Sequence, residues 1–422
     1  MKPVIPLRSS PAFWAAPIIV AATFFAYWNH LGHTVGQYTW VSYAARASDG
    51  LNFGLPLAAG AAAWAGHRYA GSRFPRAFGV RRSLLRQFLS QTWPLFAAVT
   101  VGFAAIVLVQ VERASPAPQL FGLEVLITFA AMTVAAIGFG YSLGVLMPVP
   151  VALPISIFAV YEWITFPQLD NINLSWRNIT GYTLYACCDV TSYGPDTRSV
   201  IAPILTGVAI VVVVVLVMRF RLLAILPSAA VIVAAVFAAN VLVAGTQAQG
   251  QSVRPASDLH CSGSAPKVCV YPEQAHFGMD AVASKAWNRA RDAGVTLPNL
   301  IEASDEAKET DDRILFSAPA GADDEEVLKA MAVGTYNTLT CNFPSSEPSA
   351  LPSDVRTVYA LGVVFGADPE GTLPQMFASE DAAAEGSQIS PDKVREEIGI
   401  STTSEATKAV KAWLDAQHDC RP

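Results

Sequence analysis

Long apolar runs separated by short polar segments fill the first 244 residues of the chain. A helix needs about 20 mostly apolar residues to cross a bilayer, so runs of this kind indicate transmembrane helices. Aromatic residues near the ends of several runs are typical of the two membrane interfaces. The pattern predicts seven spans, over residues 13–28, 51–66, 93–111, 122–147, 151–166, 199–218 and 222–244.

The sixth and seventh runs are divided by Arg219 and Arg221. An arginine at the centre of a bilayer would cost about 2.5 to 3.5 kcal/mol, which favours two helices with a turn between them over one long helix. Residues 222–244 imitate a signal sequence, but the apolar core of such a sequence usually runs over only about 7 to 15 residues. We therefore expect 222–244 to remain as an anchor.

In the fourth run, Gly140 and Gly144 form a GxxxG pattern that favours close helix packing.

The segment 67–91 between the second and third runs is strongly basic and contains no acidic residue. Short basic loops stay in the cytoplasm, so this loop places the amino terminus inside and the segment after the seventh run outside. Apolar residues recur among the arginines from Phe74 onward and predict an amphipathic helix at the membrane face. The loop is either a topology signal or a coupling helix, and in the second case the candidate docking residues are Arg76, Arg81, Arg82 and Arg86.

Charge divides the chain into two parts. Residues 1–244 carry 14 Lys and Arg against 7 Asp and Glu, a net charge of +7, whereas residues 245–422 carry 14 against 27, a net charge of −13. A long acidic segment after an apolar one predicts a separate domain with its own core and disfavours binding to nucleic acid. The predicted division is a bundle over 1–221, an anchor over 222–244 and an acidic extracytoplasmic domain over 245–422.

The acidic domain is expected to be α+β and mostly helical. Extended segments are predicted at 267–271 and 313–317, where short apolar runs are bounded by Pro and small residues. Capping residues and helical periodicity predict helices over 280–293, 323–336, 354–365, 391–398 and 404–417.

All six cysteines fall on the predicted outer side, where disulfides persist. Adjacent cysteines strain a bridge to each other, so Cys187 and Cys188 are expected to join separate bridges. Six cysteines allow 15 connectivities, and we expect at least two disulfides among them. The preferred pairs are Cys261 to Cys269 and Cys341 to Cys420.

The sequence lacks the GxxxxGK[ST], HExxH and CxxC patterns, and its GxSxG pattern at residues 140–144 lies inside the fourth apolar run. We therefore expect no enzyme, no cofactor and no metal site. His30 and His33, and the group around His260, Cys261, Cys269, Glu273 and His276, match no zinc spacing. Acids within spans can mark a substrate path, which makes Glu124 and Glu162 candidate pathway residues.

The order of elements up to about residue 218 resembles the membrane subunit of ABC-2 type exporters. The coupling helix, the short inner turn and the outer hairpin of that family correspond here to 67–91, 147–150 and 167–198. The stretches RSSPAFWAAP and AAAWAGHRYA also look like actinobacterial membrane proteins grouped with such permeases. The resemblance implies six spans with both ends inside and a separate ATPase subunit; the seventh run and the outer domain depart from the family.

The expected function is that of a permease-like subunit of an ABC exporter in the plasma membrane, with the outer domain assisting substrate handling or gating. Its expected partners are a separate cytoplasmic ATPase, the lipid bilayer and a second subunit in a homo- or heterodimer. The alternative is a membrane-anchored extracytoplasmic binding, sensor or immunity protein that transports nothing. An ATPase that co-purifies with the chain would distinguish the two.

Overall fold

The structure is a computed structural model, and it describes residues 11–28, 39–71, 83–113, 122–169, 175–181, 191–246, 250–304, 313–339, 351–369 and 398–418. The chain divides into two compact units. The described residues 11–181 and 194–252 form what we call the helical unit. The described residues 191–193 and those from 253 onward form the C-terminal unit.

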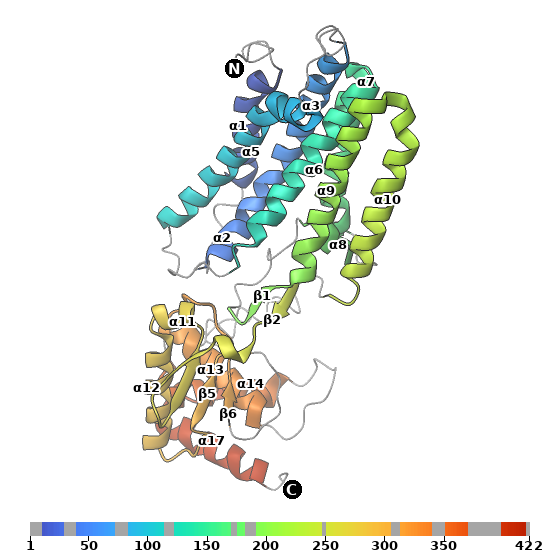
Figure 1. Cartoon of the computed structure of the whole chain (residues 1–422). Coiled ribbons are helices and arrows are strands. Elements are labelled where there is room, and N and C mark those ends of the chain that lie inside the picture. The colour runs from blue at the N-terminus through green and yellow to red at the C-terminus, as the bar shows by residue number, and fades with distance from the viewer. Residues whose placement is uncertain are drawn as a thin grey trace. The chain divides into compact units, whose positions relative to one another are not determined.

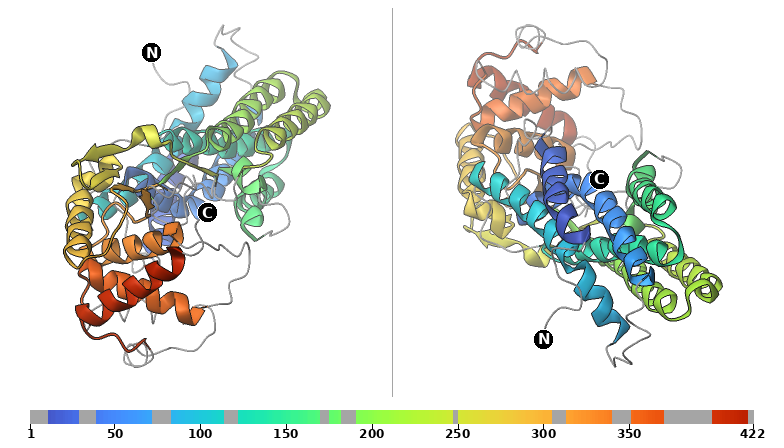
Figure 2. Two further views of the ribbon diagram at one scale, coloured as in Figure 1. Left: turned by 90° about the horizontal axis from the view of Figure 1, so that it is seen from below. Right: turned by 90° about the horizontal axis from the view of Figure 1, so that it is seen from above.

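The helical unit consists of long helices that run up and down beside one another (Figure 1). α3 lies at its centre, where it packs against α1, α5, α6 and α7, while α6 packs in turn on α9. α10 packs on α9 at one edge of the unit, which is clear when the unit is viewed from above and below (Figure 2). The elements are α1 (Pro11–Trp28), α2 (Trp40–Ala47), η3 (Ser48–Gly50), α3 (Leu51–Gly71), α5 (Leu84–Arg113), α6 (Val125–Leu146), α7 (Val149–Leu169), α8 (Ser175–Thr180), α9 (Thr197–Phe220), η4 (Arg221–Ala224) and α10 (Ile225–Leu242).

Four helical stretches among the described residues are long and apolar enough to cross a membrane: Leu84–Glu112, Val125–Leu146, Val149–Pro167 and Thr197–Leu242. This number is smaller than the seven predicted spans. The apolar part of α1, Pro11–Phe25, is shorter than these four. α3 contains many weakly apolar Ala and Gly residues and ends in His67 and Arg68, which lowers its hydropathy.

The stretch Thr197–Leu242 contains two helices, as the two arginines predicted. α9 ends at Phe220, and Arg221 has a left-handed backbone with φ 51°. The short helix η4 follows, and α10 then packs back along α9 (Figure 1). The turn therefore lies at the arginines.

Three boundaries in the helical unit differ from the predictions. α3 continues to Gly71, five residues past the predicted end, so His67 and Arg68 are helical. α5 is a 30-residue helix that begins at Leu84. Its first turns coincide with the last part of the predicted amphipathic helix. The earlier part of that predicted helix lies outside the described residues. The helix α2 lies between the first and second predicted spans, where no helix was predicted, although its apolar residues gather strongly on one face.

Glycines set the closest helix contact of the unit, between α3 and α6. A side chain on Gly140 or Gly144 of α6 would collide with the backbone of α3, at the carbonyls of Ala59 and Ala63. Gly66 of α3 meets the backbone of Tyr141 in the same way. The GxxxG prediction is therefore confirmed, because small residues let the two backbones approach directly.

The C-terminal unit has a four-stranded sheet in the order β3-β4-β5-β6. β3 pairs antiparallel with β4, whereas β4, β5 and β6 are parallel neighbours. The strands are β3 (His260–Ser262), β4 (Lys267–Val270), β5 (Leu300–Glu302) and β6 (Arg313–Leu315); two further strands, β1 (Tyr193–Pro195) and β2 (Gln251–Val253), form a separate two-stranded sheet. The predicted strands at 267–271 and 313–317 are confirmed, while β3 and β5 were not predicted.

Helices pack on this sheet and on one another around an apolar core that includes Trp287, Met331 and Phe365. Four predicted helices are confirmed, while 391–397 lies outside the described residues. Asp323 and Glu326 form a reciprocal cap at the start of α13: the N–H of Glu326 donates to Asp323 Oδ1 at 2.8 Å and the N–H of Asp323 donates to Glu326 Oε2 at 3.3 Å. The helices are α11 (Pro272–His276), α12 (Met279–Asp292), α13 (Asp324–Leu339), α14 (Leu351–Phe365) and α17 (Thr403–His418), with a 3-10 turn, η5 (Ala256–Asp258).

Cys261 and Cys269 form a disulfide, as predicted. They occupy directly opposed positions on the antiparallel strands β3 and β4. The bridge therefore closes the hairpin at the edge of the sheet. The other four cysteines lie outside the described residues: Cys187, Cys188, Cys341 and Cys420. The disulfide between Cys341 and Cys420 therefore stays a prediction.

Candidate functional site: an apolar cavity in the helical unit

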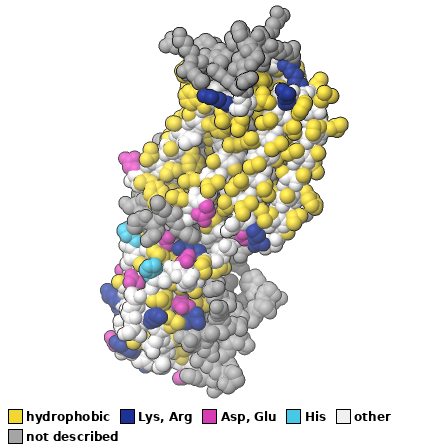
Figure 3. Space-filling model, in the orientation of Figure 1, with side chains coloured by type: hydrophobic (Ala, Val, Ile, Leu, Met, Phe, Trp, Pro, Cys, Tyr) yellow, Lys and Arg dark blue, Asp and Glu magenta, His cyan; other side chains and the backbone are white. Residues whose placement is uncertain are grey.

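One end of the helical unit gathers positive charge, and we call it the basic end. It comprises Arg68 at the end of α3, Arg86 in the first turn of α5, and Arg219 and Arg221 at the turn between α9 and α10. Dark blue side chains lie near this end of the apolar surface in Figure 3. The four cations come from three separate parts of the sequence, and folding places them together.

Two hydrogen bonds tie the helix ends at the basic end. Arg221 Nη2 donates to the carbonyl of Ala70 at 3.0 Å, which links the α9 turn to the end of α3. His67 Nδ1 lies 3.2 Å from the carbonyl oxygen of Met147, just after α6. Cationic side chains at helix carboxyl ends also interact favourably with the helix dipole. Of the predicted docking residues, Arg86 lies here, and Arg76, Arg81 and Arg82 lie outside the described residues.

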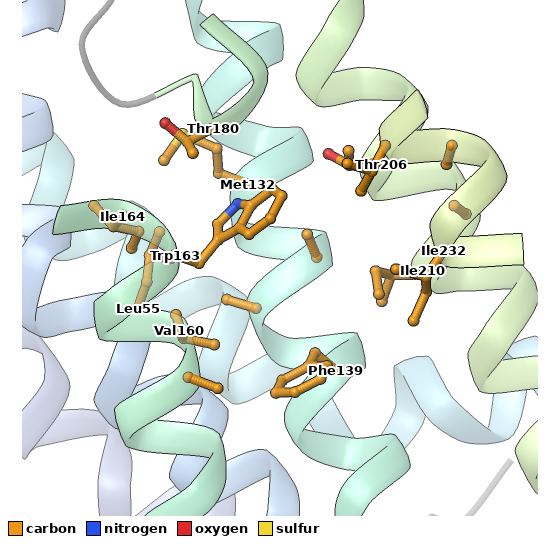
Figure 4. Close-up of a pocket in the computed structure, with 16 residues that line it drawn as sticks. Leu55, Met132, Phe139, Val160, Trp163, Ile164, Thr180, Thr206, Ile210 and Ile232 are labelled. Carbon is orange, nitrogen blue, oxygen red and sulfur yellow. The ribbon is translucent and has the colours of Figure 1, made fainter. Parts of the chain in front are cut away.

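A cavity of about 230 Å³ lies between the helices of this unit. α6 and α7 form one side and α9 and α10 the other, with contributions from α3 and α8 (Figure 4). Its walls are almost entirely apolar, and no charged side chain is among the described residues that line it. The labelled lining residues in Figure 4 are Leu55, Met132, Phe139, Val160, Trp163, Ile164, Thr180, Thr206, Ile210 and Ile232.

The few polar side chains of the cavity are unevenly placed. Thr180 on α8 and Thr206 on α9 lie on opposite walls toward one end, Phe139 lies toward the other end, and the indole of Trp163 lies between the two ends (Figure 4). Thr180 Oγ1 donates to the carbonyl of Arg177 at 2.9 Å, and Thr206 Oγ1 donates to the carbonyl of Pro203 at 2.8 Å. Each hydroxyl oxygen therefore keeps lone pairs that can accept a further hydrogen bond. The cavity thus has a polar end and an apolar end.

α10 forms one wall of the cavity while most of its surface is uncovered. Ile232, Ala235 and Val236 face the cavity, whereas Leu226 and Phe237 are 82% and 69% exposed. Only Ser228 and Ala239 of this helix are buried. A helix with so few buried side chains and so apolar a surface is suited to contact with lipid, and it forms one edge of the partly open cavity, across from α7.

The two predicted pathway acids do not line the cavity. Glu124 is exposed and directly precedes α6, and Glu162 is half-buried on α7, beside the lining residue Trp163. The prediction selected these residues because charge inside an apolar run is conspicuous. The lining residues are mostly ordinary apolar side chains, and only the arrangement of α6, α7, α9 and α10 around a common space would have identified them.

The amino end of α9 carries a compact ion pair. Asp196 caps the helix by accepting from the N–H of Arg198 at 2.8 Å, and its Oδ2 lies 2.8 Å from Arg198 Nη2. Burial acts to raise the pKa of the Asp196 carboxyl, but the hydrogen bonds and positive charge of Arg198 outweigh it and hold the pKa below its usual value. The pair therefore stays ionised at neutral pH and fixes the start of the helix.

A buried charge network organises one side of the C-terminal unit. Arg254 Nη1 lies 3.2 Å from Glu273 Oε2, and their side chains are 5% and 2% exposed. Arg254 also donates to the carbonyl of Thr191 at 3.1 Å through Nη1, and to that of Ser192 at 2.8 Å through its backbone N–H. Its guanidinium carbon lies 4.1 Å from the centre of the Tyr271 ring. The network joins Thr191 and Ser192 to the rest of the C-terminal unit.

Neither unit offers a metal site in the part of the chain that the structure describes: no three His, Cys, Asp or Glu side chains lie close enough to share an ion. Cys261 and Cys269 are joined in the disulfide, and Glu273 pairs with Arg254. The described residues that line the cavity offer apolar contact and a few hydroxyl and indole groups.

No protein-family model, no curated protein and no solved structure gives a significant match to this chain.

Proposed function

We propose that this chain is the membrane-spanning, permease-like subunit of an ABC-type exporter and works with a separate ATPase. The net positive charge of the basic end is the observation that carries the proposal: no acidic side chain accompanies its arginines among the described residues, whereas Arg198 at the opposite end of α9 is paired with Asp196. Arg68, Arg86, Arg219 and Arg221 gather at the basic end, where a cytoplasmic partner would bind, while the cavity lies among apolar helices away from it. The chain has no nucleotide-binding loop of its own, so the energy source must be another subunit.

In this proposal α1, α3, α5, α6, α7, α9 and α10 each cross the plasma membrane. Their alternating directions in Figure 1 and the turn at Arg221 support seven crossings. Arginines on short loops stay in the cytoplasm, which assigns the basic end and the amino terminus to the inside. The C-terminal unit then lies outside, where the disulfide between Cys261 and Cys269 is stable.

The alternative is a membrane-anchored extracytoplasmic binding, sensor or immunity protein. It is favoured by the extensive core of the C-terminal unit, which is separate from that of the helical unit. A simple anchor, however, needs neither a basic end assembled from several helices nor a cavity between them.

Replacing Arg81, Arg82 and Arg86 together by glutamine is expected to weaken association with the ATPase at least about tenfold, because opposite charges steer and hold such partners. Membrane insertion should persist, since Lys2, Arg8, Arg219 and Arg221 still specify the inner side. The measurement is recovery of the ATPase with the tagged chain from detergent-solubilised membranes.

The matched control replaces Lys285, Arg291 and Lys408 by glutamine, three exposed cations of the C-terminal unit. The control removes the same charge without touching the basic end and should retain the ATPase. Equal recovery with the wild type, the test variant and the control would contradict docking at the basic end.

A further inference from the structure

We infer that the cavity binds the chain of a single-chain amphiphile with a hydroxyl or carboxyl headgroup, such as a long-chain fatty acid, which enters from the membrane past α10. This inference rests on the proposed export function and names its substrate class. It follows from three properties of the cavity: its size, the uneven placement of its polar groups and the nature of the wall that α10 forms.

The size suits the headgroup and the first part of one chain. The cavity volume is about 230 Å³, and an engineered apolar cavity of about 150 Å³ stays dry and binds benzene. By that measure the cavity holds on the order of nine carbon atoms, and the rest of a longer chain would extend through its opening into the bilayer. A two-chain lipid would have to leave one chain outside.

The polar groups specify the headgroup. Thr180 and Thr206 offer acceptor oxygens at one end, and the indole N–H of Trp163 is a donor between that end and Phe139 (Figure 4). A hydroxyl or protonated carboxyl group both donates and accepts, so it matches this set. An ionised headgroup would find no charged partner among the described lining residues. The remaining wall is apolar and suits the hydrocarbon chain.

The position of α10 indicates how the amphiphile enters the cavity. α10 packs on α9, η4 and α8, and its outward face is highly exposed. α7 and α10 face each other across the cavity without packing closely on each other, so the cavity opens toward the surrounding lipid between these two helices. An amphiphile already dissolved in the bilayer would reach the cavity through this opening, past α10.

The test is photolabelling of the purified full-length chain in detergent micelles with hexadecanoic acid that carries a diazirine on its chain. Label should concentrate on peptides that contain Met132, Phe139 or Trp163, and unlabelled hexadecanoic acid should compete for it. Ala235→Trp places an indole in the cavity and should reduce this labelling at least about fivefold, because the ring would occupy the space that the fatty-acid chain needs. Ala234→Trp, one residue away on the exposed face of α10, should leave it unchanged.

If Ala235→Trp fails to fold, Thr206→Val serves as the second variant, since it removes a headgroup contact with little change in shape. It should lower labelling by the acid and leave labelling by a diazirine hydrocarbon unchanged. Label spread evenly over the exposed faces, equal labelling of the two tryptophan variants, or labelling by a diazirine phospholipid alone would overturn the inference.

Recovery of the ATPase with the same samples separates this inference from the proposed function. An ATPase that co-purifies with a chain whose cavity is not labelled would leave the export function standing and remove the fatty-acid site. A labelled cavity without any ATPase would remove the export function and leave a lipid-binding site.

Discussion

Replacing Gly144 by leucine is expected to disrupt the helical unit, with a loss of at least about 3 kcal/mol from its free energy of unfolding, at the upper end of the usual cost of overpacking. The cost is high because the new side chain would meet the carbonyl of Ala63, and a helix backbone cannot rotate away as a side chain can. Gly144→Ala should show the same effect to a smaller degree. The measurement is unfolding in mixed detergent, followed by circular dichroism and size-exclusion profile.

Gly71→Leu is the matched control for this experiment. Gly71 ends α3, and a Cβ added there would have no heavy atom within 4 Å, so leucine can be accommodated. Its stability should stay within about 1 kcal/mol of the wild type, the cost of replacing a glycine near a helix end. Equal stability of Gly144→Leu and Gly71→Leu would contradict direct backbone contact between α3 and α6.

Replacing Arg254 by methionine is expected to destabilise the C-terminal unit by about 3 to 5 kcal/mol, because it leaves the Glu273 carboxylate buried without its partner. The variant also loses the hydrogen bond to the carbonyl of Thr191 and the stacking on Tyr271. Pulse proteolysis of the full-length chain over a urea series would measure the change.

Two controls separate charge burial from other causes. The double variant Arg254→Met and Glu273→Met removes both charges and should recover most of the loss, since an apolar pair of similar volume is often as stable as a buried ion pair. Arg291→Met breaks an exposed contact with Asp292, at 3.6 Å, and should cost less than about 1 kcal/mol. A double variant as unstable as Arg254→Met would show that packing, and not the unpaired charge, causes the loss.

Much of the fold follows from local patterns in the sequence. Apolar length predicted α6, α7 and α9, and the cost of buried arginine predicted the turn at Arg221. The glycine spacing in α6 predicted the contact with α3, and the capping acids at residues 323–326 predicted α13. In each case the residues responsible lie within one short segment, so the feature can be predicted from that segment of the sequence alone.

Other features depend on residues far apart in the chain. The strands β3 and β5 are only three residues long, and pairing with β4 rather than their own composition makes them strands. Arg254 gains its role from Glu273 and from Thr191, which lies more than sixty residues away in sequence. The cavity likewise lies where α7 on one side faces α9 and α10 on the other, and periodicity within any one helix does not reveal this arrangement.

The central claim is that this chain is driven by a separate ATPase that docks at the basic end. Affinity purification of the tagged, full-length chain from its native host in mild detergent tests it most directly. We predict that an ATPase subunit with a nucleotide-binding loop co-elutes in near-stoichiometric amount, and that ATP hydrolysis by the complex falls when Arg81, Arg82 and Arg86 are replaced by glutamine. Intact chain that elutes without any nucleotide-hydrolysing partner would contradict the claim.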